Sequence, residues 1–222
     1  MLKLCIFDMD GTTVDSLRSI AYFANQTLVR NGFAPYPEEA YKTMVGNGAA
    51  KLVRRMIDGR GGNDAQYRAV LAEYNLTYDS NPLFRATAFG GITDVMDALR
   101  AKGVAIAILS NKPHTTTCKI ARALFGGRVD VCMGGRDDMP LKPAPDAVNA
   151  LMAQFGAAPS ECLYIGDTGT DMETAANAGV ASIGAEWGFR SAEELTNAGA
   201  GALAEKPMDI LDIAAQKFNM TF

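Results

Sequence analysis

Histidine is almost absent from this chain, because His114 is the only one among 222 residues. A Ser-His-Asp or Cys-His catalytic apparatus would have to use that one residue, and a metal site built from several histidines is excluded. The four cysteines (Cys5, Cys118, Cys132 and Cys162) are widely spaced and include no C-x-x-C pair. We therefore expect buried free thiols, and we expect acid–base chemistry to fall mainly to carboxylates.

Long apolar runs and a surplus of positive charge are also missing. No apolar run approaches the length needed to cross a bilayer. Two acids interrupt the short apolar stretch at the N-terminus, which a signal peptide would not tolerate. We therefore expect a cytoplasmic protein without a membrane partner. The net charge of −4 argues against nucleic acid as a partner.

Short apolar runs alternate with segments of helical spacing along most of the chain. The apolar runs are residues 4–7, 104–109, 129–133, 162–165 and 180–183. The helical segments are residues 92–102, 115–125, 144–155, 171–178, 193–198 and 208–218. This alternation predicts an α/β fold in which helices cover both faces of a parallel sheet.

The first crossover departs from this alternation, because no convincing strand signal occurs between residues 15 and 85. Helices are predicted there at residues 16–31, 38–43, 49–58 and 65–79. A segment this long is not expected to be a loop in a compact domain. We therefore predict a catalytic core at residues 1–14 and 86–222 and a small inserted all-helical cap domain at residues 15–85.

Polar segments follow four of the predicted strands. In chain order they are Asp8-Met9-Asp10-Gly11-Thr12, Ser110-Asn111-Lys112-Pro113, Leu141-Lys142-Pro143-Ala144-Pro145 and Gly166-Asp167-Thr168-Gly169-Thr170-Asp171. In an open parallel sheet, ligands bind beyond the carboxyl ends of the strands, where the strand order reverses. We therefore expect these carboxylates, hydroxyl groups and one lysine to converge at one edge of the sheet.

Such a convergence suits phosphoryl transfer. Asp8 and Asp167 can share Mg²⁺, which prefers one or two carboxylates together with water and substrate oxygens. Asp8 can attack phosphorus to form an aspartyl-phosphate, while Lys142 stabilises the charge on the transferring group. Asp10 lies two residues from Asp8 and can protonate the leaving oxygen, then activate water for the second step.

Other polar residues at this edge have candidate supporting roles. Ser110, Asn111 and the backbone N–H groups around Gly11 can hold phosphoryl oxygens. For Lys112 and His114 we favour the simpler interpretation, that both are solvated loop residues. The sequence does not decide whether either of them contacts substrate.

Thr12 and Asp171 are predicted to orient the residues that carry the chemistry. Three interpretations of Asp171 stay open: it binds metal through water, it orients Lys142, or it places a favourable charge at a helix N-terminus. An Asp at a strand end can also be a helix cap, and this alternative applies to Asp167 taken alone.

The four segments resemble the motifs of the haloacid dehalogenase superfamily, with DMDGT, the Ser of LSN, the Lys of LKPAP and GDTGTD in the family's order. The resemblance covers nearly the whole chain. It implies a Rossmann-like core with a helical cap of the first type. It also implies that Asp8 is the nucleophile and Asp10 the acid/base. Mg²⁺ would be held by Asp8, the Asp10 carbonyl and Asp167, and the phosphoryl group by Ser110 and Lys142.

The predicted cap carries the signals for substrate choice. The turn Gly46-Asn47-Gly48 leads into a helix bearing Lys51, Arg54 and Arg55. Free N–H groups at a helix start and nearby cations would suit a small carboxylate. A plain Asn-Gly turn beside a solvated basic face is the alternative. The turn is similar to the corresponding cap loop of phosphoglycolate phosphatases. A second stretch late in the chain, Trp187-Gly188-Phe189-Arg190, is also similar to that group.

Asp10 decides the reaction class that the resemblance implies. The dehalogenase branch typically lacks an acid at this position, so its presence favours phosphate ester hydrolysis or phosphomutase chemistry. We expect a Mg²⁺-dependent phosphatase, a monomer or weak homodimer, that acts on a small phosphorylated metabolite of the phosphoglycolate type. The alternatives are a sugar phosphomutase of the β-phosphoglucomutase type or a pyrophosphatase on the same core. A non-catalytic phosphate-binding protein is disfavoured because all four motifs are intact.

Overall fold

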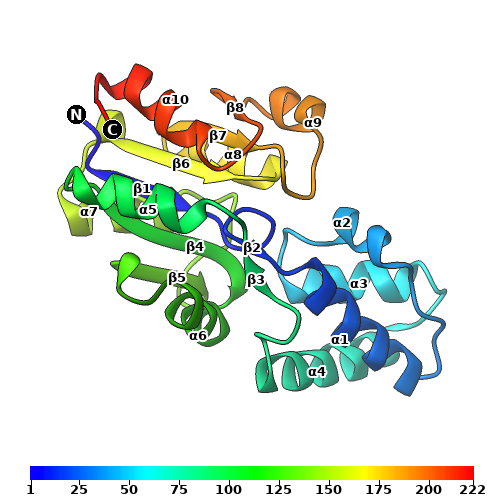
Figure 1. The fold of residues 1–222 in the computed structure, drawn as a ribbon. Coiled ribbons are helices and arrows are strands. Elements are labelled where there is room, and N and C mark those ends of the chain that lie inside the picture. Colours follow the sequence, from blue (N-terminus) through cyan, green and yellow to red (C-terminus); the bar gives the residue numbers. More distant parts are fainter. The chain divides into compact units, whose positions relative to one another are not determined.

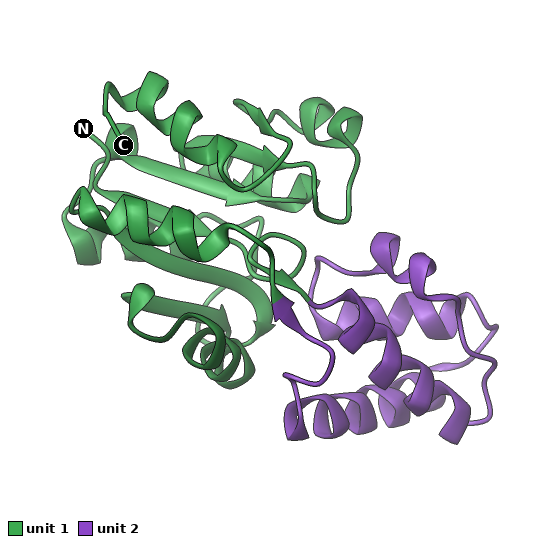
Figure 2. Ribbon diagram, viewed as in Figure 1, with its two compact units in different colours: residues 1–15, 88–222 green, residues 16–87 purple.

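A six-stranded parallel sheet lies at the centre of residues 1–15 and 88–222, one of two compact units in a computed structural model of the chain (Figures 1 and 2). The structure describes residues 1–222. The strands of the sheet are β1 (Leu4–Phe7), β4 (Ala105–Pro113), β5 (Val131–Gly135), β6 (Cys162–Gly166), β7 (Ala181–Ala185) and β8 (Leu203–Ala204). Every neighbouring pair is parallel, as the sequence predicts.

The strand order is β5-β4-β1-β6-β7-β8, so the chain first builds outward from β1 on one side and then on the other. β1 therefore lies between β4 and β6 at the point where the order reverses. Crevices at the carboxyl end of such a switch point are the usual ligand sites of open α/β sheets. The residue after β1 is Asp8 and the residue after β6 is Asp167.

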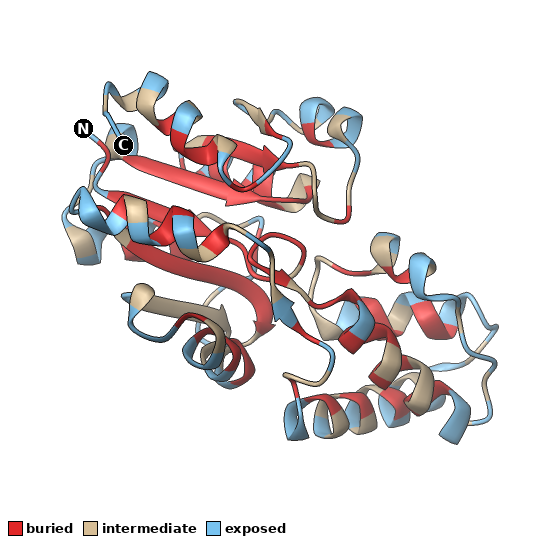
Figure 3. Ribbon diagram, in the orientation of Figure 1, coloured by how far each residue is buried: buried red, intermediate tan, exposed pale blue.

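Helices cover both faces of this sheet. They are α5 (Ile92–Ala101), α6 (His114–Phe125), α7 (Asp146–Phe155), α8 (Gly169–Asn177), α9 (Ala192–Asn197) and α10 (Asp209–Phe218), with single 3₁₀ turns η2 (Gly126–Arg128) and η3 (Pro159–Glu161). Side chains of α7 and α8 pack in one core cluster with β1, β4 and β6, and α5 and α10 lie on the opposite face (Figure 1). This double cover explains why β1 is apolar at every position and fully buried (Figure 3).

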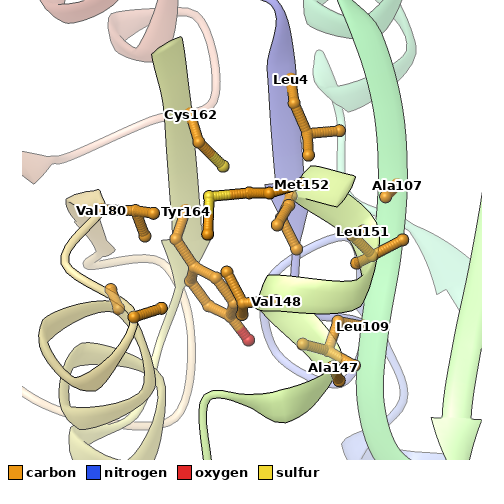
Figure 4. Packing of buried hydrophobic residues seen from close by; sticks show 13 residues of the cluster. Leu4, Ala107, Leu109, Ala147, Val148, Leu151, Met152, Cys162, Tyr164 and Val180 are labelled. Carbon is orange, nitrogen blue, oxygen red and sulfur yellow. The ribbon is translucent and has the colours of Figure 1, made fainter. Parts of the chain in front are cut away.

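Tyr164 connects the apolar core of this unit to its polar edge. The ring packs among residues of the same cluster, including Val148, Leu151 and Val180 (Figure 4). A buried phenol needs a hydrogen-bond partner, and the Tyr164 hydroxyl group donates to Asp171 Oδ1 at 3.1 Å. Packing around the ring therefore helps to fix a carboxylate at the edge of the sheet.

Residues 16–87 form the second compact unit (Figure 2), which is helical. Its helices are α1 (Leu17–Arg30), the 3₁₀ turn η1 (Glu38–Ala40), α2 (Tyr41–Met44), α3 (Ala49–Asp58) and α4 (Asp64–Ser80). A reciprocal capping box between Asn63 and Gln66 begins α4. The predicted helical insertion between the first two strands of the core is therefore confirmed.

Three short strands were not predicted. β2 (Val14–Asp15), β3 (Thr87–Ala88) and β8 have two residues each, which is too short to show a hydrophobic period. The insertion begins after β2 and ends at β3, and these two strands pair in a sheet of their own.

The end predicted for β4 was wrong. The apolar run stops at Leu109, but the strand continues to Pro113 and its register against β5 shifts between these two residues. The strand thus includes Ser110, Asn111 and Lys112, which lie in the irregular stretch between the paired residues and which the sequence placed in a loop because their side chains are polar.

Truncating a core side chain tests the packing described above. Leu151 is fully buried in the cluster of Figure 4, so we expect Leu151→Ala to lower the free energy of unfolding by about 2–5 kcal/mol. Urea unfolding followed by circular dichroism measures the change. Leu76 is 75% exposed on α4, and Leu76→Ala should change the free energy by less than about 0.5 kcal/mol. Equal effects of the two substitutions would contradict the assigned core.

Candidate active site

The ammonium group of Lys142 lies between two buried carboxylates at the carboxyl edge of the sheet. Its Nζ donates to Asp8 Oδ1 at 2.6 Å and to Asp171 Oδ1 at 2.7 Å. It also donates to the Leu109 carbonyl at 3.3 Å. Burial alone would lower the pKa of Lys142, but the charges of Asp171 and Asp8 outweigh it and raise the pKa well above its usual value. Lys142 is therefore a fixed positive charge in contact with Asp8.

Asp171 has no room left for another ligand. Its Oδ1 accepts from Lys142 and from the Tyr164 hydroxyl group, and its Oδ2 accepts from the hydroxyl group of Thr168 at 2.6 Å and the N–H of Thr168 at 3.1 Å. These four donors use both lone pairs of each oxygen. Of the three interpretations of Asp171, the structure favours the one in which it orients Lys142, and its bonds to Thr168 also cap α8.

The main chain of Lys142 is held by Asn111 at the end of β4. The Asn111 amide group donates to the Lys142 carbonyl at 3.1 Å and accepts from the Lys142 N–H at 2.9 Å. These two bonds help to place Lys142, and the predicted hold of Asn111 on phosphoryl oxygens stays a prediction. Ser110, the residue before Asn111, is also buried. Its Oγ accepts from the Lys112 N–H at 3.2 Å.

Asp167 is fully buried and has no lysine or arginine partner. Its Oδ1 accepts from the Thr12 hydroxyl group at 2.8 Å, and its Oδ2 accepts from the Phe189 N–H at 2.8 Å. Thr12 thus contacts Asp167, while its orienting role in the reaction stays a prediction. Burial, reinforced by the negative charge of Asp171, raises the pKa of Asp167 to about 7 despite these two hydrogen bonds.

Gly11 allows this close approach. A Cβ atom at Gly11 would lie 2.2 Å from Asp167 Oδ2, and the residue has a φ of +89°, so both space and backbone conformation require glycine. The Gly11 N–H donates to the Val14 carbonyl at 2.9 Å. The structure therefore explains Gly11 by its contact with Asp167, whereas the predicted role of its N–H in phosphate binding stays a prediction.

Three carboxylates lie around the single ammonium group of Lys142. Oxygen atoms of Asp8, Asp167 and Asp171 lie within 4.8 Å of one another, and Lys142 compensates one of their three negative charges. Burial, together with Asp171 and Asp167, raises the pKa of Asp8 well above its usual range, although Lys142 opposes the shift. Two uncompensated charges and hard oxygen donors fit one divalent cation such as Mg²⁺. Because Asp171 is saturated, Asp8 and Asp167 would supply the carboxylate ligands.

Asp10 is paired with Lys112, a contact that the sequence did not predict. The Lys112 ammonium lies 3.2 Å from Asp10 Oδ2, and the lysine side chain is only 7% exposed. The expectation that Lys112 is a solvated loop residue was wrong, because Lys112 belongs to β4 and extends toward the residue that follows β1 by three positions. No signal in a single sequence distinguishes this lysine from a surface lysine.

His114 is used inside the fold. Its Nδ1 accepts from the Gly134 N–H at 3.2 Å, so the first residue of α6 is tied to β5. The Cys118 thiol lies 3.8 Å from the imidazole ring. All four cysteines are free, as predicted, but Cys118 and Cys132 are only half-buried. His114 is therefore a half-buried residue that links α6 to β5. The expectation of a solvated loop residue was wrong.

The turn predicted to select substrate lies in the helical unit. Gly46 and Gly48 both have positive φ, +115° and +84°. Arg55 fixes the turn, since its guanidinium donates to the Met44 carbonyl at 2.6 Å and to Asn47 Oδ1 at 2.7 Å.

The other two cations of this helix have different surroundings. Arg54 pairs with Asp64 and stacks on Tyr67, and Lys51 is exposed on α3. Two of the three cations thus stabilise the helical unit itself. The role of Gly46, Asn47 and Gly48 in substrate choice stays a prediction.

Two contributors to the site were missed by reasoning from motifs. Tyr164 binds Asp171 from inside the core, and the Phe189 main chain binds Asp167 from the loop after β7. Tyr164 could have been suspected as the one polar group in a buried strand. The Phe189 N–H carries no side-chain signal, although the stretch that contains it is similar to phosphoglycolate phosphatases.

None of the helices combines the length and the apolar character that a membrane span requires.

Known proteins include a family that matches this chain and relatives that are similar over most of its length. A family model described as haloacid dehalogenase-like hydrolase matches residues 2–179. The chain is 35% identical to the phosphoglycolate phosphatase of Rhodospirillum rubrum over 215 residues, which cover 91% of this chain and 87% of that protein. It is 32% identical to the phosphoglycolate phosphatase of Pseudomonas putida over 216 residues, which cover 95% and 76% of the two chains.

Solved structures share the fold. The crystal structure of a proposed phosphoglycolate phosphatase from Lactobacillus delbrueckii subsp. bulgaricus matches with a TM-score of 0.90 at 28% identity, over 94% of this chain and 96% of that one. A second, from Haemophilus somnus, matches with a TM-score of 0.89 at 26% identity, over 96% and 98%. The predicted α/β fold with a helical insertion is confirmed.

The raised pKa of Asp167 predicts a pH-dependent response to Mg²⁺. Its folded-state pKa of about 7 exceeds that of an unfolded Asp, about 3.9. Below about pH 4 the carboxyl group is neutral in both the folded and the unfolded state, and the contribution of Asp167 to the stability of the cation-free protein falls as the pH rises from about 4 to about 7. Mg²⁺ must compete with the proton, so it should raise the melting temperature more at about pH 8 than at about pH 5.5.

Differential scanning fluorimetry with MgCl₂, against NaCl of equal ionic strength, measures this difference. Asp167→Asn is the matched variant, because it removes the titrating group and should show a small Mg²⁺ effect at both pH values. Equal Mg²⁺ effects on the wild type at both pH values would argue against a cation at Asp167.

Proposed function

Because this chain belongs to the haloacid dehalogenase-like hydrolases and is a phosphoric monoester hydrolase, we propose that it hydrolyses a small phosphate monoester of the phosphoglycolate type through a phosphorylated Asp8. The observation that carries the proposal is the contact of Asp8 with Lys142 at 2.6 Å, at the switch point of the sheet. Lys142 occupies Asp8 Oδ1 and no hydrogen bond reaches Oδ2. A carboxylate oxygen is therefore available to attack phosphorus.

In the first step an Asp8 oxygen forms a bond to phosphorus as the bond from phosphorus to the leaving oxygen breaks. Asp10 gives its proton to the leaving alkoxide, which departs as an alcohol. Lys142 is already in place beside Asp8, so its charge faces the phosphoryl oxygens without reorganisation. Ser110, buried within β4, is proposed as a further hydrogen-bond donor to the phosphoryl group.

In the second step water attacks the aspartyl-phosphate. Asp10, now a carboxylate, takes the proton from that water, and the bond between phosphorus and Asp8 breaks to release inorganic phosphate. Lys112 holds Asp10 Oδ2 at 3.2 Å and thereby limits the orientations that the carboxyl group adopts in both steps. A divalent cation held by Asp8, Asp167 and the Asp10 carbonyl would offset the repulsion between the nucleophile and the anionic substrate.

The choice of substrate has separate support. Curated relatives that are 35% and 32% identical over more than nine-tenths of this chain are phosphoglycolate phosphatases. Phosphoglycolate is a small dianionic ester with an additional carboxylate. The glycine-flanked turn at Gly46-Asn47-Gly48, held rigid by Arg55, is the proposed recognition element for that carboxylate.

Asp8 and Lys142 should be indispensable if this mechanism holds. We expect Asp8→Asn to lower kcat on the order of 10⁴-fold or more, because no nucleophile remains. Lys142→Met should lower kcat by about 10²- to 10³-fold, as for the loss of one group that stabilises the transition state. Release of inorganic phosphate from phosphoglycolate measures both. Asp138, whose side chain is 72% exposed, provides the control Asp138→Asn, which should retain full activity.

A panel of substrates tests the assigned ester. We expect kcat/KM to be highest for phosphoglycolate when hexose 1-phosphates, hexose 6-phosphates, nucleotides and pyrophosphate are assayed alongside it with Mg²⁺. Conversion of a hexose 1-phosphate into its 6-phosphate without release of phosphate would instead identify a phosphomutase. A preference for pyrophosphate by tenfold or more would also overturn the assignment while leaving the role of Asp8 intact.

A further inference from the structure

Asp167 is enclosed by main chain from two directions. Gly11 lies against its Oδ2 from the loop after β1, and Gly188 lies against it from the loop after β7. A Cβ atom at Gly188 would stand 2.2 Å from Asp167 Cβ and 2.5 Å from Oδ2. Real Cβ atoms essentially never come within 3.0 Å of such neighbours, so any side chain at residue 188 would displace the carboxylate. The absence of a side chain there is thus a requirement of Asp167.

The same loop also makes one direct hydrogen bond to this carboxylate and one bond to a residue that orients it. Directly after Gly188, the Phe189 N–H donates to Asp167 Oδ2 at 2.8 Å. Directly before it, the Trp187 indole Nε1–H donates to the Thr12 carbonyl at 3.0 Å. Thr12 in turn donates its hydroxyl group to Asp167 Oδ1 at 2.8 Å. Trp187 therefore acts on Asp167 through Thr12, and Phe189 acts on it directly.

These contacts leave a defined part of Asp167 for a ligand. Each of its two oxygens accepts one hydrogen bond from the protein, and each keeps one lone pair. The two donors, with the two glycines, fix the plane of the carboxylate group. A fully buried carboxylate without a cationic partner is costly to hold in this way unless a cation completes its surroundings.

We propose that Trp187, Gly188 and Phe189 are positioning residues for the divalent cation, which they serve by setting the orientation of Asp167. This rests on the proposed function only for the identity of the cation, Mg²⁺. Trp187 is the only tryptophan of the chain. Its indole is linked to Asp167 by two consecutive hydrogen bonds, so its fluorescence reports on cation binding.

The test measures Mg²⁺ binding to the full chain without substrate, by isothermal titration calorimetry and by Trp187 emission. In the wild type, MgCl₂ should change the emission in a saturable way with the same Kd as calorimetry gives, and Asp167→Asn should abolish the change. Gly188→Ala should weaken Mg²⁺ binding by about 10- to 100-fold, the range typical for groups that orient a metal ligand. Gly127→Ala is the matched control, since nothing lies within 4 Å of a Cβ atom there, and it should bind Mg²⁺ as the wild type does.

Trp187→Phe provides a second variant that keeps an aromatic ring and removes only the indole donor. We expect it to weaken Mg²⁺ binding by about tenfold by calorimetry, and to raise by a similar factor the MgCl₂ concentration that gives half-maximal phosphate ester hydrolysis. A merely structural role would lower the melting temperature of the cation-free protein and leave the Kd for Mg²⁺ unchanged. Circular dichroism and thermal unfolding without Mg²⁺ identify a variant that fails to fold, and Trp187→Phe then decides the outcome.

The two proposals fail in different ways. Unchanged Mg²⁺ affinity in both Gly188→Ala and Trp187→Phe overturns the positioning role, even if the wild type hydrolyses phosphoglycolate. Weakened Mg²⁺ binding in both variants supports the role, even if phosphoglycolate is not a substrate. A wild type that does not bind Mg²⁺ at all overturns the positioning role and also removes the cation from the proposed mechanism.

Discussion

The contact of one ammonium group with two buried carboxylates is the interaction on which this site depends. The Lys142 Nζ lies 2.6 Å from Asp8 Oδ1 and 2.7 Å from Asp171 Oδ1, although the three side chains come from different segments. The surrounding structure serves that contact: Asn111 fixes the Lys142 main chain, and Tyr164 fixes Asp171 from the core. Such a buried network is stabilising only when every member is paired, because an unpaired buried charge is strongly destabilising.

The network leaves Asp167 as the one member without a positive partner, and this is where stability and function oppose each other. Neutral donors at Thr12 and Phe189 reduce the cost of burying its charge but do not remove it, so its pKa is raised to about 7. Three buried carboxylates around one lysine are not the arrangement that would maximise stability. Under the proposed function, a divalent cation would compensate this surplus negative charge.

Close main-chain approach is the second constraint on this edge of the sheet. Gly11 and Gly188 border Asp167, and a Cβ atom at Gly166 would stand 2.3 Å from the Cβ of Asp171. Side chains at these three positions would separate the carboxylates from the donors that orient them. The geometry of this site thus depends on the absence of side chains at three positions as well as on the four polar segments.

The sequence by itself determined which elements form and which chemistry they carry. The apolar run of β1 followed by Asp8, and that of β6 followed by Asp167, are local signals that periodicity reveals. The tertiary structure alone decided the pairing of Asp10 with Lys112 and the end of β4 at Pro113. It also decided the Phe189 N–H bond to Asp167. These features depend on the order of the strands and on main-chain groups. Strand order follows from contacts between distant segments, and main-chain groups are common to all residues. Neither can therefore be recognised in a single sequence.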